Sequence, residues 1–457
     1  MNVSAQQPAV LDVSLAKTKN LSLQLTSGEW LRSFPGTDAQ KQPFLECTGC
    51  HQLQKPAFSR YNAQEMAMVL QRMTTYSNGS QPSNPQRVPG REIAPPSPRE
   101  IEMGKYVSGL NLSAVSEWEY PLKTNPRPKG TGTQVIITEY DLPRPNAAPH
   151  DVRLDPKTGL VWYDDFGAQW IGTLNPKTGK TTEYQFPVVK PGYPLGSLRL
   201  SLDNREDVIY VGNMFQAQFL KFDPATEKFT TYPRPNFMDT EARVTMLDSD
   251  HAHVDGNVWA NVVGAAKYAG SYQVDLKTNT WTKVTYAAGS PPAAAYDFAT
   301  DSKNNMFGFA LPLSSSKIWR TDAKTLHTTW FDIPSGDGGG RRGKVDAQDR
   351  VWFAQFSGNR LAMFDPRTER ITQWDMPTPW TNPYDAMYDD KTYVWTASMS
   401  NDHVVRMNVK TGEFTQYFLP RYTNIRSVEV DKSAAISSLW VGNAHGAKVL
   451  HIEPLAP

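Results

Sequence analysis

Two cysteines provide the spacing in this sequence that most clearly predicts chemistry. They are the only cysteines of the 457-residue chain, Cys47 and Cys50, and His51 follows the second one directly. In a C-x-x-C-H run the two thiols can add to the vinyl groups of a haem, and the adjacent imidazole can bind the iron. The sequence therefore predicts one covalent haem c, held by Cys47 and Cys50, with His51 as an iron ligand.

Two other chemistries use paired cysteines. A structural zinc site needs about four Cys or His ligands, and the chain has no second cysteine pair. A thioredoxin-like redox pair follows a strand within a βαβ unit, whereas Cys47 follows the helix-like segment 38–46. This plain redox pair remains the alternative. Because haem c is attached outside the cytoplasm, the motif also predicts a periplasmic protein, with a leader absent from the given chain.

The sixth iron ligand is expected downstream of the motif, from a methionine or a histidine. No histidine lies between the motif and residue 150, which leaves four methionines, namely Met66, Met68, Met73 and Met103. Several of them share one face of a predicted helix with apolar neighbours. Core packing is therefore the simplest role for most of the four.

The segment around these methionines is predicted to be helical. Asn62 and Glu65 form a capping-box pattern at the start of one helix, and Ser97 followed by Pro98 starts a second. With the segment before the cysteines, this makes three or four short helices of the kind that wrap one haem. We therefore expect a small all-α cytochrome c domain over residues 28–113.

This stretch resembles the small cytochrome c domains typified by the cytochrome subunit of sulfite dehydrogenase. The likeness rests on the C-x-x-C-H run, a helix that ends Arg72-Met73-x-x-Tyr76, and a last helix that ends Tyr106-Val107-x-x-Leu110. In that family the methionine after the basic residue ligates the iron, so the resemblance implies Met73 as the sixth ligand. Met103, inside the last helix, and Met66 are the alternatives.

From about residue 131 to the end the sequence repeats itself with a period of roughly 40 to 45 residues, which is typical of propeller blades. Each unit has one aromatic residue at the same place in its second strand: Trp162, Tyr210, Trp259, Phe307, Trp352, Trp395 and Trp440. A turn rich in Asx, Pro and Gly residues follows, and then a last strand that ends in proline. Seven units of four strands predict a seven-bladed all-β propeller over residues 131–457.

The seventh unit stops after its third strand, near Pro454, and a spare copy of the last strand precedes the first unit at 137–143. A ring must join its ends to remove the exposed edge. We therefore expect 137–143 to become the outer strand of blade seven.

These units resemble the virginiamycin B lyase (streptogramin lyase) propellers, whose blades read Pro-x-Gly-Ile, Asp-Gly-x-x-Trp-Phe and Ile-Gly-x-Ile-x-Pro-x-Thr-Gly. In that family His and Glu side chains with a magnesium ion open a lactone by elimination. The nearest match here is His150 with Asp165. Other blades place Tyr384 or Arg426 where His150 stands, so a His/Glu pair across neighbouring blades is not visible. The resemblance implies the fold more strongly than the activity.

Alignment of the first strands on their shared Asp predicts which side chains surround the propeller axis. One ring reads His150, Leu198, Arg243, Tyr296, Arg341, Tyr384 and Arg426, and the next reads Asp151, Arg199, Val244, Asp297, Arg342, Asp385 and Ser427. Guanidinium groups near an axis favour carboxylates or other anions, and Tyr and His can orient them or move protons. We select His150, Arg341, Arg426 and Tyr384 as a candidate catalytic site. The alternative is that Arg and Asp pair and line a solvated channel.

Composition and the ends of the chain add further limits. Lys and Arg total 47 against 46 Asp and Glu, a net charge of +1, which argues against nucleic-acid binding. No apolar run approaches the length of a membrane helix. Residues 1–27 alternate as one or two strands and resemble the remnant of an N-terminal sandwich-like domain, and residues 114–130 are predicted to be a linker.

Together these features predict a multidomain periplasmic oxidoreductase component. The haem would transfer electrons between the respiratory chain and a substrate or partner dehydrogenase bound by the propeller. The expected partners are an electron-transfer protein, either a dehydrogenase or a small cytochrome, and a small anionic ligand in the central funnel. The alternative is a lyase or binding propeller of the virginiamycin B lyase type with an accessory haem.

Overall fold

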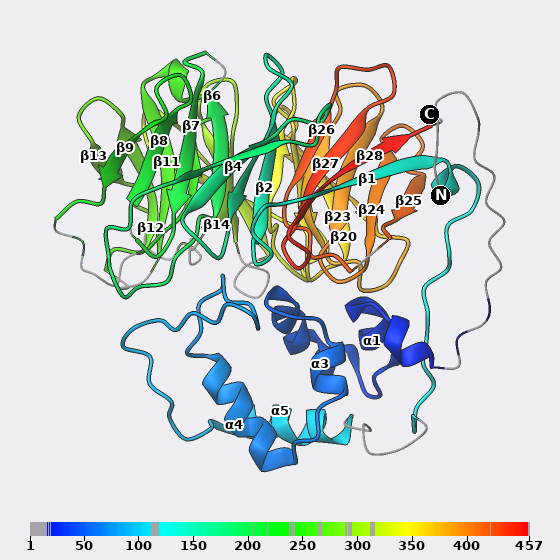
Figure 1. Ribbon diagram of the computed structural model, residues 1–457. Coiled ribbons are helices and arrows are strands. Elements are labelled where there is room, and N and C mark those ends of the chain that lie inside the picture. The colour runs from blue at the N-terminus through cyan, green and yellow to red at the C-terminus, as the bar shows by residue number, and fades with distance from the viewer. Residues whose placement is uncertain are drawn as a thin grey trace.

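The fold is known from a computed structural model of the chain (Figure 1). It describes residues 16, 18, 20–110, 118–203, 205–216, 218–236, 238, 243–263, 267–287, 290, 295–310, 316–420 and 422–455, and for 243–245 the backbone only.

Seven four-stranded antiparallel sheets form the blades of a propeller. Blade one consists of β2 (Pro149–Leu154), β3 (Val161–Asp165), β4 (Trp170–Leu174) and β5 (Thr181–Gln185). Blade two consists of β6 (Arg199–Asp203), β7 (Val208–Asn213), β8 (Gln218–Asp223) and β9 (Lys228–Pro233). Blade three consists of β10 (Arg243–Asp248), β11 (Asn257–Val263), β12 (Gly270–Asp275) and β13 (Thr280–Lys283). A 3-10 turn, η4 (Ala252–Val254), precedes β11.

Blades four to seven continue the same order. They are β14 (Ala295–Thr300), β15 (Met306–Ala310), β16 (Lys317–Thr321) and β17 (Thr328–Asp332); β18 (Gly343–Val345), β19 (Val351–Gln355), β20 (Arg360–Asp365) and β21 (Arg370–Asp375); β22 (Pro383–Tyr388), β23 (Tyr393–Ser398), β24 (His403–Asn408) and β25 (Phe414–Phe418); and β26 (Val428–Asp431), β27 (Ser438–Asn443), β28 (Lys448–Pro454) and β1 (Val135–Asp141). The innermost strands of neighbouring blades contact one another all the way round. The predicted seven-bladed propeller is confirmed.

The repeating residues build the blades. All seven second-strand aromatics are at most 4% exposed, so each fills the interface between two blades. In the hairpin turns the side chain of the first Asx residue caps the backbone, as Asn175 Oδ1 does for the amide of Lys177 at 3.0 Å. One turn residue takes a left-handed conformation, Gly179 at φ 70° and Glu227 at φ 55° in sister blades.

The first strand of the propeller closes its last blade. β1 pairs antiparallel with β28, with Ile137 opposite Ile452, and Figure 1 shows the cyan and red strands side by side. The predicted closure is confirmed, although the strand begins and ends two residues earlier than 137–143. Closure gives β28 a partner and leaves no open edge between the first and last blades.

Short helices precede the propeller and lie against one of its faces (Figure 1). They are η1 (Leu21–Gln24), α1 (Ser27–Ser33), α2 (Asp38–Lys41), η2 (Gln42–Gly49), α3 (Gln54–Ala57), α4 (Ala63–Met73) and α5 (Pro98–Gly109), and a further turn, η3 (Gly130–Thr133), leads into β1. The capping boxes Asn62–Glu65 and Ser97–Glu100 begin α4 and α5 as predicted. Among the described residues, no helix has the length and apolar character needed to cross a membrane.

The expectation of a separate all-α cytochrome c domain is wrong. The helices have at most 12 residues, and the apolar side chains of α1 and η2, such as Trp30 and Phe44, share one buried cluster with Phe356, Tyr384 and Met399 of the propeller. The amide of Gly28 also donates to the carbonyl oxygen of Ser400 at 2.8 Å. Because such short helices cannot bury their apolar faces among themselves, they bury them on the propeller. The structure is an all-β seven-bladed propeller with a few short helices.

The segments on either side of these helices also differ from expectation. Leu21–Gln24 is a 3-10 turn capped by Asn20 rather than part of a strand; the alternation at Leu11, Val13 and Leu15 lies outside the described residues. Trp118, in the predicted linker, packs on Trp30 with ring centroids 5.0 Å apart. The described part of this linker is therefore a packed segment that runs back along α1.

Candidate functional site

The C-x-x-C-H run forms one tight turn at the end of η2. The amides of Cys50 and His51 both approach the carbonyl oxygen of Cys47, at 3.4 and 3.3 Å. Neither thiol is in a disulfide. The turn thus brings two free thiols and an imidazole together within five residues, and we call residues 47–51 the Cys-His turn.

His51 has the tautomer that suits an iron ligand. Its Nδ1 lies 2.9 Å from the carbonyl oxygen of Gln52. A carbonyl oxygen only accepts, so Nδ1 carries the proton and Nε2 keeps its lone pair. Burial lowers the pKa of His51, which favours the neutral, metal-binding form. The donor set of the turn therefore fits a covalently attached haem with His51 on the iron.

The thiols do not have the electrostatics of a reactive redox pair. Burial, reinforced by Cys50 and Glu46, raises the pKa of Cys47 to about 12. Burial also raises the pKa of Cys50, although the Arg426 guanidinium acts in the opposite direction. Redox-active C-x-x-C pairs instead lower the pKa of one thiol. Among the described residues, no three His, Cys, Asp or Glu side chains are grouped to hold a metal ion.

Blade seven holds the Cys-His turn by its backbone. The side-chain amide of Asn424 donates to the carbonyl oxygen of Thr48 at 2.9 Å. The Arg426 guanidinium donates to the carbonyl oxygen of Gly49. His445 Nε2 lies 3.4 Å from the same Gly49 oxygen. Burial and the nearby Arg426 lower the pKa of His445 to about 3, so a neutral imidazole faces the turn.

Arg341 lies among three aromatic rings next to the turn. Its guanidinium carbon is 4.2 Å from the ring centres of both Phe356 and Tyr384 and 5.1 Å from that of Tyr296. Nε and Nη1 have no hydrogen-bond partner among the described residues, and the carboxylate of Glu46 lies 3.9 Å from Nη1. The hydroxyls of Tyr296 and Tyr384 are hydrogen-bonded to each other. Arg341 is thus a buried cation with donors to spare.

The second predicted ring is internally paired instead. Arg342 donates to Asp151 Oδ2 at 3.2 Å and to Asp297 Oδ2 at 3.0 Å. Arg199 bridges Asp297 and Asp248, at 3.2 and 3.1 Å. The buried carboxylates of Asp151 and Asp297 outweigh the effect of burial and raise the pKa of Arg342 well above its usual value. For these two arginines the paired arrangement applies, and they support the channel wall.

His150 lies between the two rings. It is fully buried, with Nδ1 3.3 Å from Asp151 Oδ1, and its Nε2 has no hydrogen-bond partner among the described residues. Burial lowers the pKa of His150 to about 4. Its ring lies 6.1 Å from that of Tyr384, so three of the predicted funnel residues, His150, Tyr384 and Arg341, form one chain of contacts. The side chain of Arg243 lies outside the described residues.

The candidate methionine ligands occupy different surroundings. Met73, at the C-terminal end of α4, is 39% exposed and lies outside the apolar cluster that includes Cys47. Met66 and Met103 belong to that cluster. Met68 is exposed.

Sequence reasoning missed several polar residues. Asn424, which contacts the Cys-His turn, was not considered, nor were Asn401 and Asp402 in the β23–β24 loop, which line a separate cleft. The repeat gives no clear signal for these residues. The loop residues 399–403 read Met-Ser-Asn-Asp-His, but sister loops also carry polar side chains, such as Gln169 in 166–169 and His445 in 444–447.

Comparisons with known proteins agree with this architecture. Neither a protein-family model nor a curated relative matches the sequence. Among solved structures, virginiamycin B lyase from Staphylococcus aureus, in its selenomethionine form, superposes with a TM-score of 0.58 at 15% identity, covering 70% of this chain and 99% of that one. A streptogramin B lyase gives a TM-score of 0.57 at 15% identity, with 71% and 99% covered. At such identities the likeness shows the fold alone: the chain is a seven-bladed propeller with virginiamycin B lyase-like structural neighbours.

Proposed function

We propose that the chain is a periplasmic haem c protein in which the propeller binds the molecule that exchanges electrons with the haem. The observation that carries this proposal is the Cys-His turn, with two free thiols and with His51 Nδ1 held by a backbone oxygen. Cys47 and Cys50 would attach the haem and His51 would bind its iron. Haem bound there would supply a one-electron redox centre.

The position of the turn supports a link between the two parts of the chain. Its carbonyl oxygens at Thr48 and Gly49 are held by Asn424 and Arg426, and both of these lie just before the innermost strand of blade seven. A ligand in the funnel would therefore lie close to the turn. The electron partner is a small substrate or a partner dehydrogenase, with the respiratory chain at the other end.

Arg341 is the proposed anchor for a small anion in the funnel. Its Nε and Nη1 lack hydrogen-bond partners among the described residues, and hydrogen bonds from a charged donor to an anion are stronger than neutral ones. Tyr384, within 3.4 Å of Arg341 Nη2, would orient the anion. His150 is neutral, its Nε2 has no hydrogen-bond partner among the described residues, and it would accept or deliver a proton. Arg426 has the structural task of holding Gly49 and adds positive charge.

A second candidate function is a lyase or binding propeller with an accessory haem. The likeness to the solved lyase structures supports it, since nearly the whole of those chains is covered. The base in this case would again be His150. The nearby Asp165 is occupied, because its carboxylate accepts from Arg144 at 2.6 Å and from the Gly167 amide at 2.8 Å.

Haem attachment is the decisive test. The full chain would be exported to the periplasm of a host that assembles haem c, purified, and run on a denaturing gel stained for haem peroxidase activity. We expect stain and a mass increase of one haem for the unaltered chain and for the exposed control Ser83→Ala, and neither for the double variant Cys47→Ser/Cys50→Ser. Haem that is stripped by denaturation would refute covalent attachment.

Donor-driven reduction distinguishes the two functions. Reduction of the haem by candidate anionic donors would be followed by stopped-flow absorption for the unaltered chain and Arg341→Ala. We expect the variant to lose at least tenfold in apparent affinity for the donor. Elimination activity without any haem reduction would favour the lyase candidate.

A further inference from the structure

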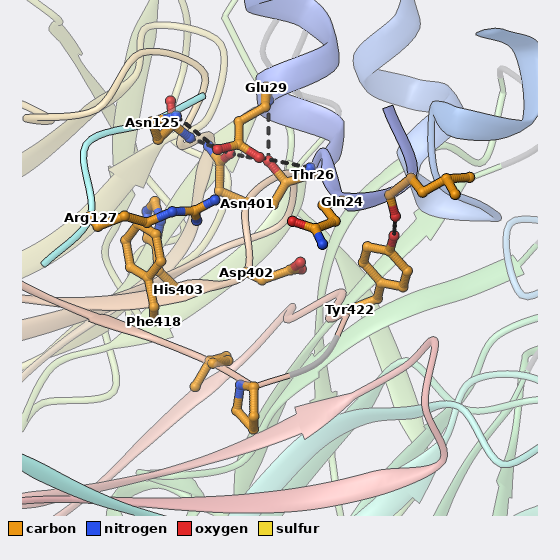
Figure 2. Close-up of a pocket in the computed structure, with 13 residues that line it drawn as sticks. Gln24, Thr26, Glu29, Asn125, Arg127, Asn401, Asp402, His403, Phe418 and Tyr422 are labelled. Carbon is orange, nitrogen blue, oxygen red and sulfur yellow. Dashed lines mark hydrogen bonds between the residues drawn. The ribbon is translucent and has the colours of Figure 1, made fainter. Parts of the chain in front are cut away.

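A cleft lies away from the Cys-His turn. It is at the seam where α1 and the segment that follows Trp118 meet blades six and seven. Its volume is about 510 Å³, within the roughly 300–1,000 Å³ of small-molecule sites. Figure 2 shows Gln24, Arg127, Asp402, His403, Phe418 and Tyr422 around it. None of its lining residues belongs to the turn.

One wall of this seam cleft is held by hydrogen bonds of Asn401 and Glu29. The Asn401 side-chain oxygen accepts from Thr26 Oγ1 at 2.7 Å and from Asn125 Nδ2 at 2.8 Å, and its Nδ2 donates to the Trp380 carbonyl at 2.8 Å. Both carboxylate oxygens of the buried Glu29 accept hydrogen bonds from backbone amides, from Thr26 at 2.9 Å and from Asn125 at 2.7 Å. These groups hold the wall and are not available to a ligand.

Two charged groups of the lining remain available. Asp402 Oδ1 accepts from the amide and hydroxyl of Thr423 at 2.8 and 3.2 Å, but Oδ2 has no partner among the described residues. Arg127 lies over the Phe418 ring, 5.5 Å from its centre, with no ion pair or hydrogen bond among the described residues. Figure 2 shows Arg127 to the left of Asp402, and both belong to the residues that line the cleft.

His403 packs on the same ring as Arg127, with its own ring centroid 5.7 Å from that of Phe418. It is 1% exposed, and its Nε2 lies 3.4 Å from Thr381 Oγ1. The Thr381 hydroxyl already donates to the Thr378 carbonyl at 2.8 Å, so Nε2 must be the donor. Nδ1 is then a lone-pair acceptor, and it has no partner among the described residues. Burial lowers the pKa of His403 to about 3, so the ring stays neutral.

We infer that the seam cleft binds a small zwitterion of dipeptide size, whose carboxylate pairs with Arg127 and whose ammonium group is held by Asp402. The lining offers an exposed cation and a carboxylate oxygen without a partner among the described residues, which matches a ligand with both charges. An ammonium group pairs with a carboxylate through charge-assisted hydrogen bonds, which are stronger than those of a neutral hydroxyl. Phe418 and Tyr422 add aromatic surface to the lining.

The electrostatics of Asp402 agree with a cationic partner. Burial, with a contribution from Glu29, raises the pKa of Asp402 to about 7. A carboxyl group in that state lacks a compensating cation, and an ammonium group beside it would stabilise its charged form. This inference stands apart from haem and from the funnel, since it uses neither the Cys-His turn nor Arg341.

Calorimetric titration of the full chain with three probes tests the inference. The probes are L-alanyl-L-alanine, its N-acetyl form, which lacks the ammonium group, and its C-terminal amide, which lacks the carboxylate. We expect the zwitterion to bind and each blocked form to bind at least tenfold more weakly. Equal affinities for the three, or no binding of the zwitterion at millimolar concentration, would overturn the inference.

Variants assign each end of the ligand. Arg127→Ala should bind the zwitterion tenfold or more weakly than the unaltered chain does. This variant should also bind the zwitterion and its C-terminal amide with similar affinity. Asp402→Asn, which can still accept from Thr423, should no longer discriminate against the N-acetyl form. The control Lys129→Ala, an exposed cation two residues from Arg127 and outside the lining, should bind like the unaltered chain. Should Asp402→Asn fail to fold, the blocked probes and Arg127→Ala still decide.

Discussion

The guanidinium of Arg426 donates a hydrogen bond to the carbonyl oxygen of Gly49, one of the two residues between the cysteines. The same side chain donates from Nε to Asn424 Oδ1 at 2.7 Å and lies over the Phe166 ring. A residue at the start of the last blade therefore fixes the middle of the Cys-His turn, 377 positions away. The propeller and the turn are one structural unit at this point.

Replacement of Arg426 by Ala should loosen the turn from blade seven. A hydrogen bond from a charged group contributes about 1.5–3 kcal/mol, so the free energy of unfolding in urea should fall by about that amount. The exposed control Arg370→Ala should stay within about 0.5 kcal/mol of the unaltered chain. Equal stability of the two variants would mean that the contact with Gly49 contributes nothing to holding the turn.

Replacement of Met73 by Ala should remove the sulfur-to-iron absorption band at the red edge of the visible spectrum, once the haem is attached. Met66→Ala and Met103→Ala should keep the band. Met66→Ala should instead lower the free energy of unfolding by about 2–5 kcal/mol. The Met66 side chain is buried and fills the cluster around Cys47. A band that survives Met73→Ala and disappears in one of the other two variants would move the assignment to that methionine.

Asp164 should make the protein less stable as the pH rises. Burial and the neighbouring Asp151 raise the pKa of Asp164 to about 8, above the roughly 3.9 of an unfolded Asp. Between these values the folded chain binds more protons than the unfolded chain, so this group lowers the free energy of unfolding with each step up in pH.

Thermal melting from pH 5 to 8.5 checks this. Asp164→Asn should gain stability relative to the unaltered chain as the pH rises, while the exposed control Glu119→Gln should follow the unaltered chain. Parallel profiles for Asp164→Asn and the unaltered chain would show that this carboxyl keeps an ordinary pKa in the folded state.

Two adjacent isoleucines of β1 should differ in their contribution to ring closure. Ile137 packs into the cluster between blades six and seven, whereas Ile136 is 49% exposed. Ile137→Ala should lower the free energy of unfolding by about 1–2 kcal/mol, and Ile136→Ala by less than about 0.5 kcal/mol. Urea titration of both variants gives the comparison, and equal effects would argue against β1 as the inner-packed closing strand.

The sequence alone determined the features that repeat or that depend on near neighbours. The second-strand aromatics, the Asx turns and the spare strand that became β1 predicted seven closed blades, because each blade carries its own copy of the pattern. The capping boxes at Asn62 and Ser97 placed the starts of two helices, because a cap needs only residues three positions apart. The Cys-His spacing is equally local.

Tertiary structure decided how these parts meet. Arg341 and Arg342 are adjacent in the sequence, yet Arg342 pairs with Asp151 and Asp297 across the axis, while Arg341 lies among aromatic rings beside the turn. Their partners come from other blades and become neighbours only when the ring closes. The short helices form no separate domain for the same kind of reason. Their apolar faces are completed by Phe356, Tyr384 and Met399, residues whose position depends on the whole propeller and on no local pattern.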